Sequence, residues 1–325
     1  MKVVSLFSGA GGLDLGFIEA GHEVVWANDN FPDAVKTYKK NIGNHIVCQD
    51  IATIKSENIP DHDILIGGFP CQGFSLANSK REENDKRNTL YLELLRVLID
   101  KQPKFFLAEN VKGILSLNKG KVFEMIIKDF SEAGYKVQHK ILNAADYGVP
   151  QRRERVIIIG VRTDIGLELK YPKTSHEQKD LLNFSNKKPW LSIGEALKNI
   201  PEPEDYHSLS NHTYSKFKLK FNGYLGNRKI DPTRPAPTVT ARGDEKGGVV
   251  VLHHPNNHRR MSVRELALVQ SFPINFIFEG NNSSAYRQIG NAVPPLLGLA
   301  VASIFPLSLN YDGTDKTSRE TICQL

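Results

Sequence analysis

The first 162 residues alternate between short apolar runs and longer amphipathic stretches. The apolar runs predict buried strands at Val3–Phe7, Glu23–Ala27, His45–Val47, Ile64–Ile66, Phe105–Ala108, Val137–Leu142 and Arg155–Val161. The stretches between them predict helices at Leu13–Ala20, Asp33–Asn41, Leu90–Asp100 and Val122–Ala133. Strands that alternate with helices are typical of a mostly parallel sheet with helices on both faces, so we expect a doubly wound α/β fold.

A glycine-rich turn, Phe7–Gly12, follows the first predicted strand and leads directly into a helix. Glycines let the backbone approach a ligand closely and adopt positive φ angles. About twenty residues further on, Asp29 ends the second strand, where nucleoside-binding α/β folds hold ribose hydroxyls. Asp50 ends the third strand and can accept a hydrogen bond from an adenine amino group. The glycine spacing is not GxGxxG, so a nucleoside cofactor is favoured over a dinucleotide.

A cysteine and an acid follow two later strands. Cys71 comes after the apolar run that ends at Ile66, and Glu109 comes directly after Phe105–Ala108. Reacting groups of open α/β sheets gather at such strand ends, and a thiol beside a carboxylic acid suits covalent catalysis on an electron-poor ring. Each residue alone could equally be structural, the thiol as a buried hydrophobe and the acid as a helix cap. We expect the buried role for Cys48.

The composition excludes several classes of protein. No run approaches the roughly 18 to 20 apolar residues of a membrane span. Met1–Ser5 is predicted to enter a strand at once, so we expect no signal peptide. Three cysteines without a pairing pattern favour a reducing, cytoplasmic setting. No Cys/His cluster has zinc spacing, so no metal is expected, and His253, His254 and His258 are expected in a solvated turn. The net charge of +6 favours a polyanionic partner.

The positive charge is concentrated in the second half of the chain. Residues 163–260 carry 16 Lys and Arg against 11 Asp and Glu. The regular spacing of apolar residues that marks strands and helices is weaker there. We expect a separate, loop-rich domain that contacts nucleic-acid backbone, with a solvated surface insert as the alternative. An apolar helix at Pro294–Phe305 is expected to rejoin the first domain, and 310–325 is a polar tail. The predicted domains are residues 1–175, 176–280 and 281–325.

Six sequence motifs occur in this order along the chain: Phe7–Gly12, Pro70–Gln72, Glu109–Val111, Gln151–Arg155, Arg264–Ala267 with Gln270–Pro273, and Gln288–Pro294. They resemble those of the DNA (cytosine-5) methyltransferase family of prokaryotic restriction-modification systems. The resemblance implies an S-adenosylmethionine-dependent methyltransferase sheet joined to a smaller, loop-rich DNA-recognition domain. It also implies S-adenosyl-L-methionine as cofactor. The residues expected to bind it are Phe7, Ser8, Gly9, Gly11, Gly12, Asp29, Asn30, Asp50, Ile51, Pro70, Leu90, Asn291 and Ala292.

The same resemblance implies the chemistry. Cys71 would add to carbon 6 of cytosine, Glu109 would act at ring nitrogen 3, and Arg153 and Arg155 would bind the base and a nearby phosphate. The cytosine would be flipped out of the duplex, beneath a mobile loop formed by 72–88. In one departure from the family, Asn88 stands where glycine is common. Residues expected to contact DNA are Gln72, Ser75, Arg87, Gln151, Thr238 and Arg242.

Two alternatives share this scaffold. One is a tRNA methyltransferase, but that branch carries a cysteine in its recognition region, and no cysteine lies between Cys71 and Cys323. The other is a non-catalytic DNA-binding regulator, which the presence of Cys71 and Glu109 disfavours. The favoured interpretation is a monomeric enzyme acting on double-stranded DNA, with a cognate restriction endonuclease that forms no stable complex with it. The source would be prokaryotic.

Overall fold

The computed structural model describes residues 1–70, 90–178, 186–216, 218–223, 227–241 and 251–309. The main sheet consists of β1 (Lys2–Leu6), β2 (Glu23–Asp29), β3 (Ile46–Cys48), β4 (Ile64–Gly67), β5 (Phe105–Val111), β6 (Tyr135–Asn143) and β7 (Glu154–Arg162). The helices that flank it are α1 (Gly12–Glu19), α2 (Pro32–Asn41), α3 (Leu90–Lys101), α4 (Lys121–Glu132) and α8 (Pro295–Ala302). Short 3₁₀ segments are η1 (Ile51–Thr53), η2 (Ser56–Asn58), η5 (Lys112–Gly120), η6 (Ala144–Tyr147) and η7 (Thr163–Ile165).

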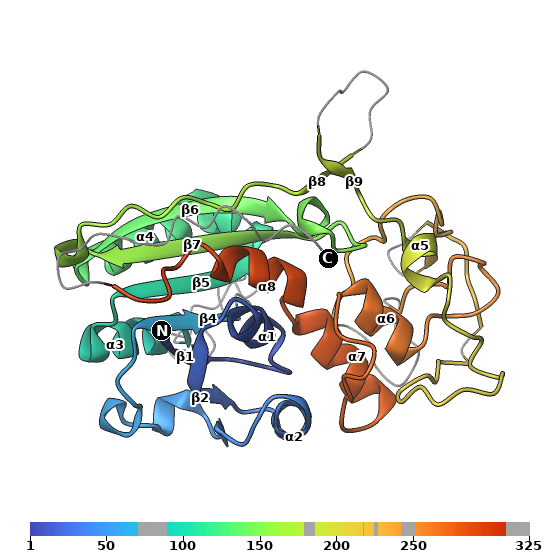
Figure 1. Cartoon of the computed structure of the whole chain (residues 1–325), viewed down its shortest axis with the longest axis horizontal. Coiled ribbons are helices and arrows are strands. Elements are labelled where there is room, and N and C mark those ends of the chain that lie inside the picture. The colour runs from blue at the N-terminus through green and yellow to red at the C-terminus, as the bar shows by residue number, and fades with distance from the viewer. Residues whose placement is uncertain (71–89, 179–185, 217, 224–226, 242–250, 310–325) are drawn as a thin grey trace.

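The strands lie in the order β3-β2-β1-β4-β5-β7-β6, with β7 antiparallel to both of its neighbours and the other pairs parallel (Figure 1). The mostly parallel α/β fold predicted from the sequence is therefore confirmed. Every strand and helix predicted in this part is present, with ends within three residues of those expected.

The register of the sheet aligns the ends of four strands. Leu6 of β1 pairs with Asn28 of β2 on one side and with Gly67 of β4 on the other. Gly67 in turn pairs with Ala108 of β5. The residues that follow these positions are Phe7, Asp29, Gly68 and Glu109. The glycine turn, the ribose candidate and the acid candidate thus leave the sheet along one edge, where α/β folds bind their ligands.

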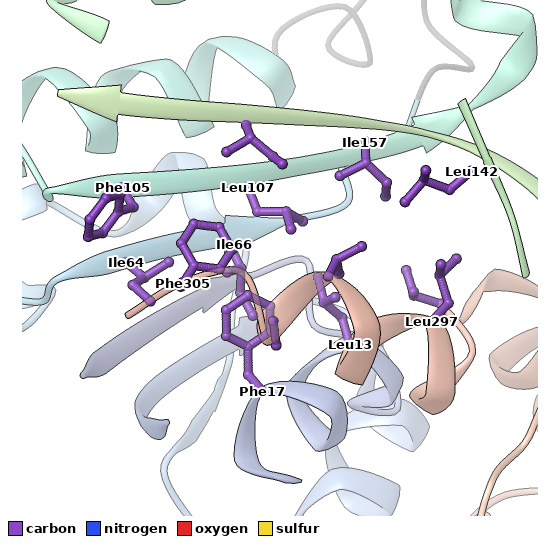
Figure 2. Packing of buried hydrophobic residues seen from close by; sticks show 14 of the residues in the cluster. Leu13, Phe17, Ile64, Ile66, Phe105, Leu107, Leu142, Ile157, Leu297 and Phe305 are labelled. Carbon is purple, nitrogen blue, oxygen red and sulfur yellow. The ribbon is translucent and has the colours of Figure 1, made fainter. Parts of the chain in front are cut away.

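Two hydrophobic clusters cover the two faces of the sheet, because successive strand residues point to opposite sides. On one face, α1 and α8 pack over β1, β4, β5 and β7. Figure 2 shows Leu13 and Phe17 below Leu107 and Ile66, and Leu297 below Leu142. On the other face, α3 and α4 pack over the alternate residues of the same strands. Burial on both faces accounts for the nearly continuous apolar sequences of these strands.

A second part of the molecule lies beside the sheet and holds α5 (Ile193–Leu197), α6 (Val263–Val269) and α7 (Asn282–Asn291) (Figure 1). Two short strands, β8 (His176–Glu177) and β9 (Lys188–Pro189), pair in parallel. A third hydrophobic cluster joins these helices, and it includes α7. Residues after 280 therefore divide between two cores, because α7 packs with α6 whereas α8 packs on α1. The domain boundaries given above remain predictions.

Two expectations are wrong about local structure, and three helices were not expected. Cys48 is exposed at the end of edge strand β3, so the buried role predicted for it is wrong. His253 and His254 are buried rather than solvated, because His253 packs against the Phe221 ring and His254 lies beside Glu265 of α6, whereas His258 is exposed. Helices α5, α6 and α7 were not predicted, because they are short and their apolar periodicity is interrupted. No helix among the described residues is long and apolar enough to span a membrane.

Candidate active site

The glycine turn has an unusual backbone. Phe7, Gly9 and Gly11 have φ angles of 56°, 56° and 85°, all in the left-handed region. Phe7 is a bulky residue in a conformation that favours glycine, and such strain gathers at functional sites. Ser8 holds the turn on β2, because its Oγ donates to the oxygen of Asn28 at 3.0 Å. A Cβ built on Gly9 would contact nothing within 4 Å, so the turn is open on that side.

Asp29 fixes the same turn from the end of β2. Its Oδ2 accepts from the main-chain nitrogen of Gly9 at 2.8 Å, and its Oδ1 accepts from that of Phe31 at 2.8 Å. Burial raises the pKa of Asp29 above its ordinary value, while these main-chain donors oppose the rise. Each carboxylate oxygen retains further acceptor capacity, so Asp29 can also receive hydroxyl groups of a ligand.

The other predicted cofactor residues surround the turn unevenly. Ile51 is buried, whereas Asn30 and Asp50 beside it are exposed. Asp50 Oδ1 accepts from the nitrogen of Ala52 and caps η1. Pro70 is exposed after β4, and Leu90 begins α3.

A buried polar network lies beneath the turn. Asp14, in the first turn of α1, is fully buried and accepts from Ser5 Oγ and from the Tyr38 hydroxyl, each at 2.8 Å. The Tyr38 oxygen also lies 3.0 Å from His45 Nε2. Burial raises the pKa of Asp14 to about 6, against the opposing effect of its two hydroxyl donors. A Cβ on Gly11 would approach the Tyr38 ring to 2.9 Å, so the turn rests directly on this network.

The end of the last motif, Gln288–Pro294, packs against the start of α1. A Cβ on Gly12 would lie 2.2 Å from the oxygen of Val293 and 3.4 Å from Cβ of Ala292. Only glycine therefore permits this approach. Ala292 is largely buried and Asn291 is exposed. Ala292, one of the residues predicted to bind the cofactor, therefore adjoins the glycine turn.

Glu109 forms an ion pair at the end of β5. Arg155 Nε lies 2.7 Å from Glu109 Oε1, and the two side chains are only 10% and 11% exposed. The antiparallel register places Val111 opposite Arg155, so the sheet itself brings the two groups together. A Cβ on Gly68 would lie 3.0 Å from Glu109 Oε2, which shows that this oxygen sits against the end of β4. The acid is thus held from one side by Arg155 and from the other by the strand that leads to Cys71.

The remaining predicted residues divide into two groups. Gln151 and Arg153 are 0% and 1% exposed, and their side chains are bonded inside the protein rather than presented to a ligand. Thr238 is partly buried and its Oγ1 donates to the oxygen of Arg152 at 2.7 Å. Five predicted residues lie outside the part of the chain that the structure describes: Cys71, Gln72, Ser75, Arg87 and Arg242.

Comparison with known proteins identifies the family. The family model of the C-5 cytosine-specific DNA methylases matches residues 1–304. The chain belongs to this family. M.NgoFVII, a type II methyltransferase of Neisseria gonorrhoeae, is 41% identical over 97% of this chain and 89% of its own length. M.FnuDI, a type II methyltransferase of Fusobacterium nucleatum, is 41% identical over 93% of both chains. A prophage-encoded E. coli protein described as a DNA modification methyltransferase has a similar crystal structure, with a TM-score of 0.70, 25% identity and coverage of 93% and 97%.

Membership in the cytosine-5 DNA methylase family makes the chain a DNA cytosine-5 methyltransferase, as the motifs predicted. Sequence reasoning missed several residues that organise its site. Asn110 is one, because its Nδ2 donates to the oxygen of Phe69 at 2.9 Å. Gly68 and Asp14 are others. Asn110 adjoins Glu109 in the acid motif, so its position was a usable signal, whereas Asp14 gave none because its partners lie 9 and 24 residues away.

One group in this methyltransferase has the chemistry of metal ligands. Candidate ligand atoms of Glu202, His254 and His258 all lie within 4.8 Å of one another. However, Arg259 Nε already donates to Glu202 Oε2 at 2.7 Å, and the same guanidinium donates to both oxygens of Glu265. The local negative charge is thus compensated by a cation of the protein, and we assign no metal to this group.

Proposed function

We propose that this enzyme transfers a methyl group from S-adenosylmethionine to carbon 5 of a cytosine flipped out of duplex DNA, through a covalent adduct on Cys71. The observation that carries the proposal is the Glu109–Arg155 pair, which stands at the end of β5 against Gly68. Gly68 precedes Cys71 by three residues. The glycine turn leaves the same edge of the sheet, so an acid, a thiol and a cofactor pocket would converge there.

The residues around the glycine turn fit S-adenosylmethionine. Gly9 leaves open space, Asp29 offers carboxylate oxygens for ribose hydroxyls, and the buried Ile51 offers an apolar surface for adenine. Phe7, Ser8, Gly11, Gly12, Asn30, Asp50, Pro70, Leu90, Asn291 and Ala292 complete the proposed pocket. When bound, the cofactor supplies an electrophilic methyl group.

The protein's own residues activate the base. Cytosine carbon 5 is a weak nucleophile, and addition of the Cys71 thiolate to carbon 6 would move the ring's π electrons onto carbon 5. In its protonated form, Glu109 would donate a hydrogen bond to ring nitrogen 3 and so stabilise the negative charge that thiolate addition places on the ring. Arg155 would hold Glu109 in place and bind the edge of the base. After carbon 5 is methylated and loses its proton, the sulfur–carbon bond breaks and Cys71 is released.

The second part of the molecule would recognise DNA. We propose that residues 176–280 form the recognition domain, because this region holds most of the basic, loop-rich segment. Thr238 and Arg242 would lie at the target site, with Gln72, Ser75 and Arg87 on the catalytic side. A base inside a duplex is inaccessible to Cys71, so the cytosine would be extruded into the pocket.

The similarity to type II methyltransferases supports a role as the modification enzyme of a restriction-modification system. In that role the enzyme would act as a monomer on double-stranded DNA, and a separate endonuclease would cut the same site without binding the methyltransferase.

The proposal is tested by incubating the purified protein with labelled S-adenosylmethionine and either long unmethylated duplex DNA or tRNA. Label should enter the duplex as 5-methylcytosine and should not enter tRNA. The Cys71→Ser variant should bind DNA but transfer no label, because a hydroxyl is a far poorer nucleophile at neutral pH. Label at another base position, or turnover by Cys71→Ser within tenfold of wild type, would refute the proposed chemistry.

A further inference from the structure

Three buried polar side chains meet between the sheet and α6. They are Gln151, Arg153 and Gln270, and each is at most 1% exposed. Gln151 Nε2 donates to Gln270 Oε1 at 2.7 Å. Buried polar groups are costly unless all are bonded, so a compact polar network in this place needs a structural reason. We call it the polar hub.

Arg153 bonds main-chain oxygens from two distant parts of the chain. Its Nη1 donates to the oxygen of Val239 at 2.7 Å, and its Nη2 donates to those of Gly290 and Ala292, both at 2.9 Å. Arg153 Nε is buried and has no hydrogen-bond partner among the described residues. Glu109, the carboxylate that attracts Arg153, is already paired with Arg155. Both terminal nitrogens of Arg153 thus serve to hold main chain in place.

The two glutamines hold the same two segments. Gln151 Oε1 accepts from the main-chain nitrogen of Val239 at 2.8 Å. Val239 is therefore hydrogen-bonded at its nitrogen by Gln151 and at its oxygen by Arg153. Gln270 Nε2 donates to the oxygen of Ile289 at 2.6 Å and to that of Ala292 at 3.3 Å. Residues 236–241 are here named the recognition segment. The hub side chains therefore bind this segment at Val239 and the end of α7 at Ile289, Gly290 and Ala292.

The two segments also touch directly. A Cβ on Gly290 would lie 2.3 Å from the nitrogen of Ala241, so α7 packs against the recognition segment with no room for a side chain. Just after α7, the main-chain oxygen of Val293 lies against Gly12 in the glycine turn. The contacts run without interruption from the recognition segment, through the hub and the end of α7, to the proposed cofactor pocket.

We propose that Gln151, Arg153 and Gln270 are positioning residues that hold Val239 and Ala292 in a fixed relation, so that one network sets the affinity for both DNA and cofactor. The inference rests on the proposed function, because it takes the recognition segment as the DNA side and Ala292 as the cofactor side. It replaces the contacts with base, phosphate and DNA that the sequence predicted for Arg153 and Gln151.

The test is Gln270→Met, which keeps the shape of the side chain but removes its hydrogen bonds to Gln151, Ile289 and Ala292. KM for S-adenosylmethionine and KM for a long unmethylated DNA of mixed sequence should both rise about tenfold, with kcat within about threefold of wild type. The control is Gln138→Met in β6, which removes a 2.7 Å bond to the oxygen of Leu169 at the far edge of the sheet. It should leave both KM values unchanged.

A second variant covers the case in which Gln270→Met does not fold. Arg153→Lys keeps the charge but cannot reach all three carbonyl oxygens, so it should raise both KM values in the same way. Because both variants disrupt one network, the double variant should raise KM less than the product of the single effects. Unchanged KM values with a lowered melting temperature, or a rise in only one of them, would overturn the inference.

The outcome can be separated from that of the proposed function. Binding of S-adenosylhomocysteine and of the same DNA can be measured by calorimetry without turnover. Absence of methylation by the wild-type enzyme would count against the proposed function alone. Unaltered binding of both ligands by the two variants would count against the hub alone.

Discussion

Asn110 Nδ2 donates to the main-chain oxygen of Phe69 at 2.9 Å, and this bond joins the end of β5 to the chain that leaves β4. Asn110 is only 3% exposed, and its Oδ1 accepts from the nitrogen of Val111. Phe69 precedes Cys71 by two residues, and Asn110 follows Glu109 directly. The bond therefore fixes the acid and the chain leading to the proposed nucleophile relative to each other.

Asn110→Leu should lower kcat by about tenfold or more, because the Phe69 oxygen loses its donor and the approach to Cys71 is no longer fixed. The control is Asn41→Leu, which removes bonds from Asn41 Nδ2 to the oxygens of Thr37 and Ile277, far from the acid. Both variants should lose about 1 to 3 kcal/mol of unfolding free energy in urea titrations. Equal kcat values in the two would show that the Asn110 bond only stabilises the fold.

Gly68→Ala should reduce turnover, because its Cβ would lie 3.0 Å from Glu109 Oε2 and press on the carboxylate. We expect a fall in kcat of about tenfold, with little change in cofactor affinity. Gly113→Ala is the matched control, since a Cβ there would meet nothing within 4 Å. Steady-state kinetics with duplex DNA measure the difference. Wild-type kcat in Gly68→Ala would mean that Glu109 Oε2 has no role near β4.

Glu109→Gln preserves the shape of the side chain but removes its charge and its ion pair with Arg155. Turnover should fall about 10²-fold or more, because an amide cannot exchange a proton with the ring. Glu154→Gln is the control, since Glu154 pairs with Lys112 at 2.9 Å on the surface. It should retain wild-type turnover. A pH–rate profile left unchanged by Glu109→Gln would make Glu109 a structural cap.

Asp14 should make folding stability depend on pH. Because its pKa is raised to about 6 by burial, the folded state binds a proton more readily than the unfolded state. The stabilisation of the folded state by this proton on Asp14 is fully present below about pH 4 and is lost as the pH rises through about 6. Relative to Asp14→Asn, the wild type should therefore lose about 3 kcal/mol of unfolding free energy between about pH 4 and pH 6, at about 1.4 kcal/mol per pKa unit.

Comparing the two proteins is necessary because His22 acts in the opposite direction. Burial lowers the pKa of His22 to about 4, which makes the fold more stable as the pH rises. His22 is present in both proteins, so its effect cancels in the difference. Urea unfolding at several pH values measures that difference. A difference independent of pH would mean that Asp14 stays ionised in the fold.

The strand ends could be predicted from the sequence, because each apolar run stops at the residue where the chemistry begins. Glu109 directly follows the apolar run of β5, and Asp29 is the last residue of β2. The parallel register of β1, β2, β4 and β5 then brings their positions to one edge. Glycine positions were informative as well, since Gly12 lies where the main chain of Val293 approaches too closely for a side chain, and Gly9 faces open space. These signals are local, so the sequence alone carries them.

Contacts between distant segments could not be predicted in this way. Gln151 and Arg153 occur in a polar stretch typical of a surface loop, but packing of residues 236–241 and α7 over them buries both. Gln270 lies in a motif that the sequence singled out, but its buried bonds to Gln151, Ile289 and Ala292 join residues 119, 19 and 22 positions away and could not be anticipated. Cys48 was misjudged for the converse reason, since β3 is an edge strand and leaves its end uncovered.

Covalent catalysis by Cys71 is tested most directly by trapping the adduct on DNA in which 5-fluorocytosine replaces cytosine. Methylation of this base would proceed, but fluorine cannot leave as a proton does, so the protein–DNA bond should survive heating in detergent. The adduct should require S-adenosylmethionine for its methylated form, and peptide mapping should place it on Cys71 and not on Cys48 or Cys323. An adduct on another residue, or none from an enzyme that methylates ordinary cytosine, would contradict the mechanism.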